Sequence, residues 1–120
     1  MGTVVRPILI AILLASVGFA QGGQKKHPVN GKWDAKVGSQ SYHMVIAEDQ
    51  GDVSGTVTPA GGESCEIEYG LALGDELEFT TVERGVEFEW TAKAGKSSIK
   101  GTRLNLDDET EVRFTAKRAR

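Results

Sequence analysis

From residue 31 onward, apolar and polar residues of this chain alternate with a period of two. The clearest run is VEFEWTAK at residues 86–93, and the same pattern places Trp33, Ala35 and Val37 on one side of a segment whose intervening residues are charged. Successive side chains of a β-strand point to opposite faces, so this pattern predicts strands with one buried and one wet face. Spacing typical of a helix never persists for a whole helix, and the chain is therefore predicted to be all-β.

Eight such runs can be counted, separated by short segments rich in turn-forming residues. They span about 31–37, 42–48, 52–58, 64–71, 76–82, 86–93, 97–104 and 110–117. Connections this short join antiparallel neighbours, because a parallel crossover needs a dozen or more residues. A weak repeat begins at Gly51, Gly74 and Gly95, with spacings of 23 and then 21 residues. Such a spacing matches one hairpin, so four hairpins would supply the eight strands.

A meander of eight strands with one apolar face must cover that face and also its two edges. Closure into a barrel achieves both, and we predict an eight-stranded antiparallel up-and-down barrel. The alternative is a two-sheet β-sandwich built from similar strands. A sandwich usually needs long Greek-key connections, and the sequence offers no obvious candidate for one.

The first 20 residues have the features of a signal peptide. A short segment carrying Arg6 precedes an apolar run at 8–17, which is too short to span a membrane as a helix. Gly18 and Ala20 are the small residues expected before a cleavage site that precedes Gln21. We therefore predict a signal peptide at 1–20, a flexible leader at 21–30 and a β-barrel domain at 31–118. The mature protein is expected to be secreted or periplasmic, with no stable membrane span.

Charge and cysteine content limit the partners of the domain. Cleavage would remove Arg6, leaving 13 Lys and Arg against 17 Asp and Glu, a formal net charge of −4. Charges that alternate in sign predict no broad electropositive face, which argues against nucleic acid as a partner. Cys65 is the only cysteine, so the domain must fold without an internal disulfide. Alternation predicts Cys65 to be a small buried residue on the face of Ile67 and Tyr69, with a reactive or intermolecular thiol as the alternative.

Two motifs resemble a known family pattern. GKW at residues 31–33 opens the first predicted strand, and GDVSGT at residues 51–56 overlaps the third. This combination resembles the calycins, which include lipocalins, fatty-acid-binding proteins and avidins, and is similar to small exported bacterial domains of no assigned activity. The resemblance implies a small barrel in which Trp33 plugs one end. Biotin binding is not implied, because Ala35 and Val57 stand where avidins have an asparagine and a tyrosine.

Four aromatic residues on the predicted inward face are the candidate ligand-binding residues. They are Trp33, Tyr42, Tyr69 and Trp90. A tyrosine combines an apolar ring with a hydrogen-bonding hydroxyl, and a tryptophan offers a flat face to a ring or a sugar. An eight-stranded barrel is just wide enough for its own side chains or one small ligand, so a packed interior is the alternative role of these four residues.

No sequence pattern indicates catalysis, a metal site or a cofactor. There is no Ser-His-Asp arrangement and no Gly-x-Ser-x-Gly elbow, and His43 is predicted to lie on the outer wall without ligand partners. The acidic segment 104–109 lacks the spacing of a calcium-binding loop and is predicted to be a solvated turn. Three glutamate pairs are expected to face water as solubilising charges: Glu66 and Glu68, Glu76 and Glu78, and Glu87 and Glu89.

The sequence therefore predicts an exported, non-enzymatic binding module. The favoured ligand is small and apolar or amphipathic, and it is expected at a barrel mouth near the four aromatic residues. The alternative is a protein-interaction or inhibitor barrel, whose interior is solid and whose loops contact an exported enzyme. A hydrolase is the least favoured hypothesis, because no catalytic arrangement is present.

Overall fold

The computed structural model describes residues 29–119, and every regular element among them is a β-strand. The strands are β1 Gly31–Val37, β2 Gln40–Asp49, β3 Asp52–Pro59, β4 Cys65–Glu66, β5 Glu68–Leu73, β6 Glu76–Glu83, β7 Val86–Ala94, β8 Ser98–Asn105 and β9 Glu111–Arg118. The predicted signal peptide at 1–20 and most of the predicted leader at 21–30 lie outside the described residues. Residues 29–119 include no helix long and apolar enough to cross a membrane.

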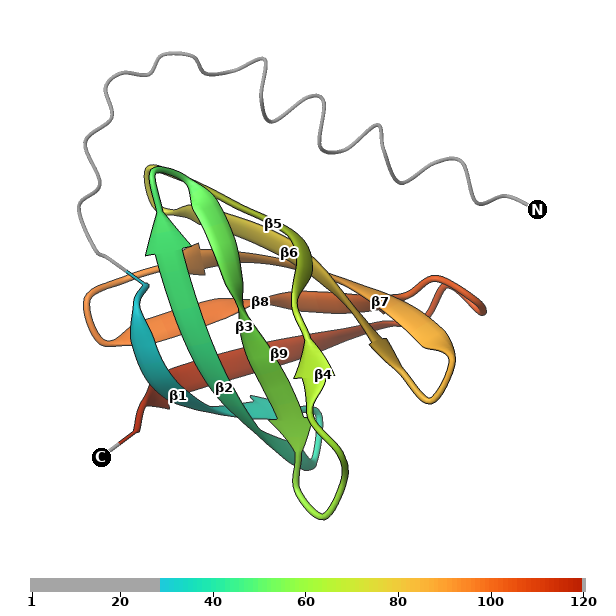
Figure 1. The fold of residues 1–120 in the computed structure, drawn as a ribbon. Helices are drawn as coiled ribbons and strands as arrows, with labels where there is room; N and C mark the ends of the chain where they lie inside the picture. The colour runs from blue at the N-terminus through green and yellow to red at the C-terminus, as the bar shows by residue number, and fades with distance from the viewer. Residues whose placement is uncertain (1–28, 120) are drawn as a thin grey trace.

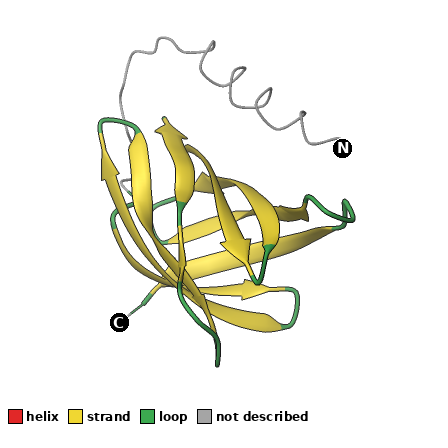
Figure 2. Ribbon diagram, turned by 45° about the vertical axis from the view of Figure 1, so that its right-hand side comes forward, coloured by secondary structure: helices red, strands yellow, loops and turns green. Residues whose placement is uncertain are grey.

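The strands form one closed antiparallel barrel (Figure 1). Neighbours in sequence pair with each other, β4 and β5 share the place between β3 and β6, and β9 pairs with β1 to complete the ring. In Figure 1, β2 and β3 cross in front of β8 and β9 at a steep angle, as strand tilt in a small barrel requires. Figure 2 shows how short most of the connections are. The predicted up-and-down barrel is confirmed, and the sandwich alternative is excluded.

The fourth predicted strand is interrupted, and the interruption turns one side chain outward. A bulge between Glu68 and Leu71 shifts the register of β5 against β6, and Tyr69 within it has a left-handed φ of 52°. Tyr69 is 76% exposed, so the prediction that it faces the interior is wrong. The extra residue of a bulge breaks the alternation on which that prediction depended. Gly70 permits this close packing, since a Cβ there would lie 2.4 Å from the Val53 carbonyl oxygen.

Inward-pointing side chains from all around the ring fill the barrel. The largest fully buried ones are Trp33, Trp90, Phe79, Met44, Ile99, Val57 and Thr81. Trp90 stacks on Phe79 with ring centroids 5.4 Å apart, and it packs edge-on against Phe114 at 5.1 Å. Each such aromatic pair contributes about 0.5–1.5 kcal/mol beyond the burial of its area. The interior around Trp90 is therefore packed with side chains.

Trp33 closes the end of the barrel at which the described chain begins and ends. Its indole Nε1 donates a hydrogen bond to the Val29 carbonyl oxygen at 2.9 Å, and the residue has no exposed surface. The Arg118 guanidinium lies 4.1 Å from the centre of the indole and donates to the Asn30 carbonyl oxygen at 2.6 Å. These contacts join the segment before β1 to the end of β9. The barrel and the position of Trp33 are compatible with a calycin-like fold.

Candidate functional site

The other end of the barrel, which we call the distal end, gathers polar and aromatic side chains from several strands. The β1–β2 turn, the β3–β4 loop, the β6–β7 turn and the β8–β9 loop all lie there, because consecutive antiparallel strands turn at alternate ends. Tyr42 near the start of β2, Glu83 at the end of β6 and Arg103 near the end of β8 meet at this end.

Arg103 projects into the barrel, because it continues the inward face of β8 that begins with Ile99. Its guanidinium carbon lies 4.1 Å from the centre of the Phe88 ring, and 5.6 Å and 5.7 Å from the rings of Trp90 and Tyr42. Cation–π attraction of about 0.5–2 kcal/mol stabilises such an arrangement. Nη1 donates to the Tyr42 hydroxyl at 2.7 Å, whereas the buried Nε has no hydrogen-bond partner among residues 29–119. Arg103 therefore keeps unused donor capacity inside the barrel end.

Tyr42 connects Arg103 to Glu83. Its hydroxyl accepts the hydrogen bond from Arg103 and donates one to Glu83 Oε1 at 3.0 Å. Burial raises the pKa of Tyr42, the positive charge of Arg103 opposes this shift, and the Glu83 carboxylate adds to it. The phenol therefore keeps its proton at neutral pH and remains a donor to Glu83.

The side chains beneath this hydrogen-bonded chain already have their partners. Trp90 Nε1 donates to Thr81 Oγ1 at 3.1 Å, and both residues are fully buried. Trp90 also packs edge-on against Tyr42, with ring centroids 5.8 Å apart. The distal end thus has an apolar floor, and its polar edge is formed by Tyr42, Glu83 and Arg103.

A groove of about 590 Å³ lies next to this edge, between the β3–β4 loop and the β6–β7 turn. It is lined by Gln40 and by residues 59–65 and 82–84. Glu83 lines the groove and accepts from Tyr42, so it connects the groove to the barrel interior. Sites for small molecules typically have volumes of roughly 300–1,000 Å³, and this groove is within that range.

Cys65 lines the same groove and is half-buried, which makes it more exposed than the sequence predicted. Burial raises the pKa of the thiol, and the carboxylates of Glu83 and Glu63 raise it further. The sulfur lies 3.8 Å from the Glu63 carbonyl oxygen. Because the thiolate is the reactive form, Cys65 is expected to be a poor nucleophile at neutral pH.

The four aromatic residues predicted to bind a ligand are divided among three places. Tyr42 and Trp90 are in contact at the distal end. Trp33 lies at the opposite end against Arg118, and Tyr69 is on the outer surface. The structure therefore brings together two of the four, and a role in ligand binding stays a prediction for each of them.

The sequence patterns did not indicate Arg103 or Glu83, because only apolar residues were expected on the inward face. A signal for Arg103 was nevertheless present. Counting in steps of two from the apolar Ile99 passes through Gly101 and reaches Arg103. Position along the strand alone thus predicts that Arg103 points inward, whatever its charge.

One of the glutamates predicted to face water is buried instead. Glu89 lies on the outward face of β7, opposite Thr80 and Leu104, yet only 5% of it is exposed. That prediction was wrong, because alternation decides which face a side chain takes and not what covers the face. Glu78 on β6 is half-buried; burial raises the pKa of its carboxyl, and the neighbouring Glu76 adds to the shift.

Within residues 29–119, no three His, Cys, Asp or Glu side chains are grouped closely enough to hold a metal ion. His43 lies on the outer wall as predicted, where its Nδ1 is 3.1 Å from Asp34 Oδ1 of β1. The acidic segment after β8 is an exposed turn stabilised by its own side chains. Asn105 Oδ1 accepts from the backbone amides of Asp107 and Asp108 at 2.8 and 3.2 Å.

Comparisons with known proteins assign neither a family nor an activity to this barrel. The sequence matches no protein-family model, and neither a curated protein nor a solved structure matches it significantly. The function must therefore be argued from the geometry of the distal end and of the barrel surface.

Proposed function

We propose that this chain is an exported, non-enzymatic binding module that holds a small amphipathic ligand at the distal end of its barrel. The observation that carries the proposal is the buried Arg103 Nε, which has no hydrogen-bond partner among the described residues. Roughly nine in ten buried polar groups of folded proteins have such a partner. A ligand oxygen that accepts from Arg103 would satisfy this donor.

The surroundings of Arg103 define the chemistry of the ligand. A guanidinium stays charged at physiological pH and presents several donors in one plane, so it favours a carboxylate or another oxygen-rich group. The Phe88 ring at 4.1 Å and the Trp90 ring at 5.6 Å favour an apolar body next to that group. The groove beside Glu83 offers room for this body. These features together describe an amphipathic molecule.

Tyr42 and Glu83 are positioning residues in this proposal. Tyr42 holds the Arg103 guanidinium through the 2.7 Å hydrogen bond, and Glu83 holds the Tyr42 hydroxyl at 3.0 Å. A guanidinium that is oriented before binding loses less conformational entropy when the ligand arrives. Loss of the Tyr42 hydroxyl is therefore expected to weaken binding even though Arg103 is still present.

The ligand proposal is tested by thermal unfolding of the mature protein with octanoate and with octanol, which share one apolar body. Octanoate is expected to raise the melting temperature more than octanol, because Arg103 favours a carboxylate. The Arg103→Met variant should lose this difference. Arg113→Met, on the outward face of β9 and away from this groove, is the matched control and should keep it. Failure of both compounds to stabilise the protein, or an unchanged difference in Arg103→Met, contradicts the proposal.

Export is supported by the charged start, the short apolar run and the small residues at 1–20. Protein recovered from outside the cytoplasm is expected to begin at Gln21, which its intact mass would show. A recovered chain that retains residues 1–20 would contradict the cleavage part of the proposal. Native mass spectrometry of the same sample would also reveal a retained ligand.

A second candidate function is favoured by the packed interior around Trp90, Phe79 and Phe114. In this protein-interaction or inhibitor barrel, the loops of the distal end contact an exported enzyme and no small ligand enters. Neither octanoate nor octanol then stabilises the protein. Instead, native mass spectrometry shows a protein bound to it, and substitutions at residues 60–64 of the β3–β4 loop release that protein.

A further inference from the structure

The outer wall formed by β8, β9 and β1, with the adjoining part of β7, is strongly basic. We call five exposed residues the basic wall: Lys36 on β1, Lys93 on β7, Lys100 on β8, and Arg113 and Lys117 on β9. Asp34 and Glu111 are the acidic residues on the outward faces of β1, β8 and β9. The sequence predicted no broad electropositive face, and on these outward faces the cations outnumber the carboxylates. The cations are distributed over distant strands, and closure of the barrel brings them to one side.

Cross-strand register arranges part of the basic wall in a row. Successive partners across four strands are Lys36, Thr115, Lys100 and Lys93. With about 4.8 Å between neighbouring strands, the row is roughly 14 Å long. It crosses the strands and so forms a track along the outside of the barrel, rather than a single point of charge.

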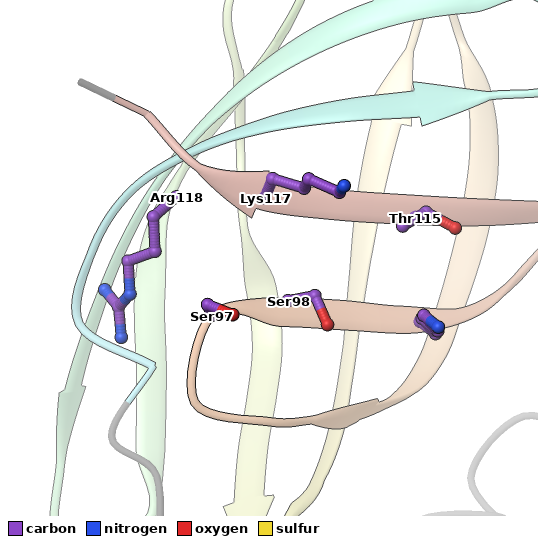
Figure 3. Close-up of a pocket in the computed structure, with 6 residues that line it drawn as sticks. Ser97, Ser98, Thr115, Lys117 and Arg118 are labelled. Carbon is purple, nitrogen blue, oxygen red and sulfur yellow. The ribbon is translucent and has the colours of Figure 1, made fainter.

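A groove of about 540 Å³ lies on this wall between β8 and β9 (Figure 3). Its lining residues are Ser97, Ser98, Lys100, Thr115, Lys117 and Arg118. In Figure 3, Thr115 and Lys117 project from β9 beside Ser98 of β8, so hydroxyl groups and cations are mixed along the groove. Arg118 at its end is already engaged with Trp33. The groove thus presents hydroxyl and ammonium donors to solvent.

Two lysines of the basic wall have a carboxylate as a cross-strand neighbour: Glu76 is opposite Lys93, and Asp34 is opposite Lys117. Lys36, Lys93 and Lys100 form no ion pair with any described carboxylate. Lys93 and Lys100 are directly opposite each other on β7 and β8, an arrangement of like charges that destabilises a sheet. Unfavourable arrangements of this kind are expected mainly at functional or strained sites of natural proteins. The facing lysines therefore indicate a candidate binding surface.

We infer that the basic wall binds a linear acidic polysaccharide. The carboxylates of the polysaccharide lie against the lysine ammonium groups, and its hydroxyls form hydrogen bonds with the side-chain hydroxyls of Ser98 and Thr115. The wall and the distal end are separate surfaces, so this inference does not rest on the proposed ligand at Arg103.

The composition of the wall distinguishes a polysaccharide from other polyanions. Single-stranded nucleic acid is typically held by aromatic side chains on which its bases stack, and the outward residues of β1, β8 and β9 include no aromatic ring. A protein interface has an apolar core with aromatic or arginine anchors, whereas the groove is lined by hydroxyls and cations. Lysine donors reach carboxylates and hydroxyls without a fixed geometry, which suits a flexible acidic glycan.

The test measures binding of the mature protein to an oligogalacturonate by isothermal titration calorimetry at about 0.1 M salt, where the Debye length is about 10 Å. Affinity is expected to fall steadily as salt is raised, because ion pairs with the polymer are screened. The Lys100→Glu variant is expected to lower the affinity about tenfold or more, since it replaces attraction by repulsion in the groove. Its melting temperature is expected to rise, because the like-charge pair with Lys93 is removed.

Arg84→Glu is the matched control, with the same change of charge at the exposed β6–β7 turn of the distal end. It should leave the affinity within about twofold, because the turn lies at the distal end, whereas the groove is lined by residues near the start of β8 and the end of β9. Polyglutamate and single-stranded DNA represent the other classes of partner and are expected to bind more weakly than the glycan. The inference is overturned if the oligogalacturonate does not bind, if both variants lose the same affinity, or if either other polymer binds as tightly.

Discussion

Arg103 Nη1 and the Tyr42 hydroxyl are 2.7 Å apart across the distal end of the barrel, although the two residues are separated by 61 positions in the sequence. The same hydroxyl donates to Glu83. One phenol therefore connects a cation and a carboxylate that form no ion pair with each other. Its removal leaves both charged groups with one hydrogen bond fewer, and this makes the contribution of Tyr42 measurable.

The Tyr42→Phe substitution is expected to lower the free energy of unfolding by about 1–3 kcal/mol, because Arg103 and Glu83 each lose a partner in a largely buried setting. Urea denaturation measures the change. Tyr69→Phe is the matched control, since it removes the same atom from a side chain that projects into solvent. That control should alter stability by no more than about 0.5 kcal/mol. Equal effects of the two substitutions would show that the connection to Arg103 contributes nothing.

Arg118→Met is expected to destabilise the barrel by about 1–2 kcal/mol, because it removes the cation over the Trp33 ring and the hydrogen bond to Asn30. The local signal is the near-ultraviolet circular dichroism of the indole, which should change with the substitution. Arg113→Met, on the outward face of the same strand, is the control and should change neither quantity appreciably. If both variants unfold at the same urea concentration as the original protein, Arg118 does not stabilise this end.

Glu78→Gln is expected to make the protein more stable at pH 7. Burial and Glu76 raise the pKa of Glu78 above its ordinary value of 4.5, so the folded state binds this proton more tightly than the unfolded state does. Stability therefore falls as the pH rises above that value, and a glutamine removes the unfavourable ionisation. Urea denaturation at neutral and acidic pH should show the advantage of the variant shrinking below about pH 4.5. An advantage that grows on acidification has the wrong sign for this explanation.

The strands could be predicted closely because their signal is local. The predicted segment 31–37 coincides with β1, and the predicted segment 86–93 is one residue shorter than β7. Alternation involves only a few consecutive residues, and the turns between the runs were short enough to require antiparallel neighbours. A closed barrel then followed, because it covers the apolar face and the two edges together.

The same rule failed wherever a strand departed from regular pairing or a charged group turned inward. At Tyr69 a bulge adds a residue and reverses the side chain. At Arg103 the alternation was regular, but only apolar residues were considered for the inward face, so no prediction was made for this arginine. At Glu89 the face was predicted correctly and the burial was not. In each case, the side chain's environment depends on neighbours that are remote in the sequence.

By itself, the sequence determined that the domain is all-β, that its connections are short, and that aromatic residues such as Trp33 and Trp90 are buried. Only the tertiary structure decided that Tyr42, Glu83 and Arg103 meet at one end, and that Lys36 and Lys100 lie on one wall. The physical reason is that alternation assigns each side chain to a face, whereas its position along the barrel depends on the register of every strand in the ring. That register is established only when all the strands pair together.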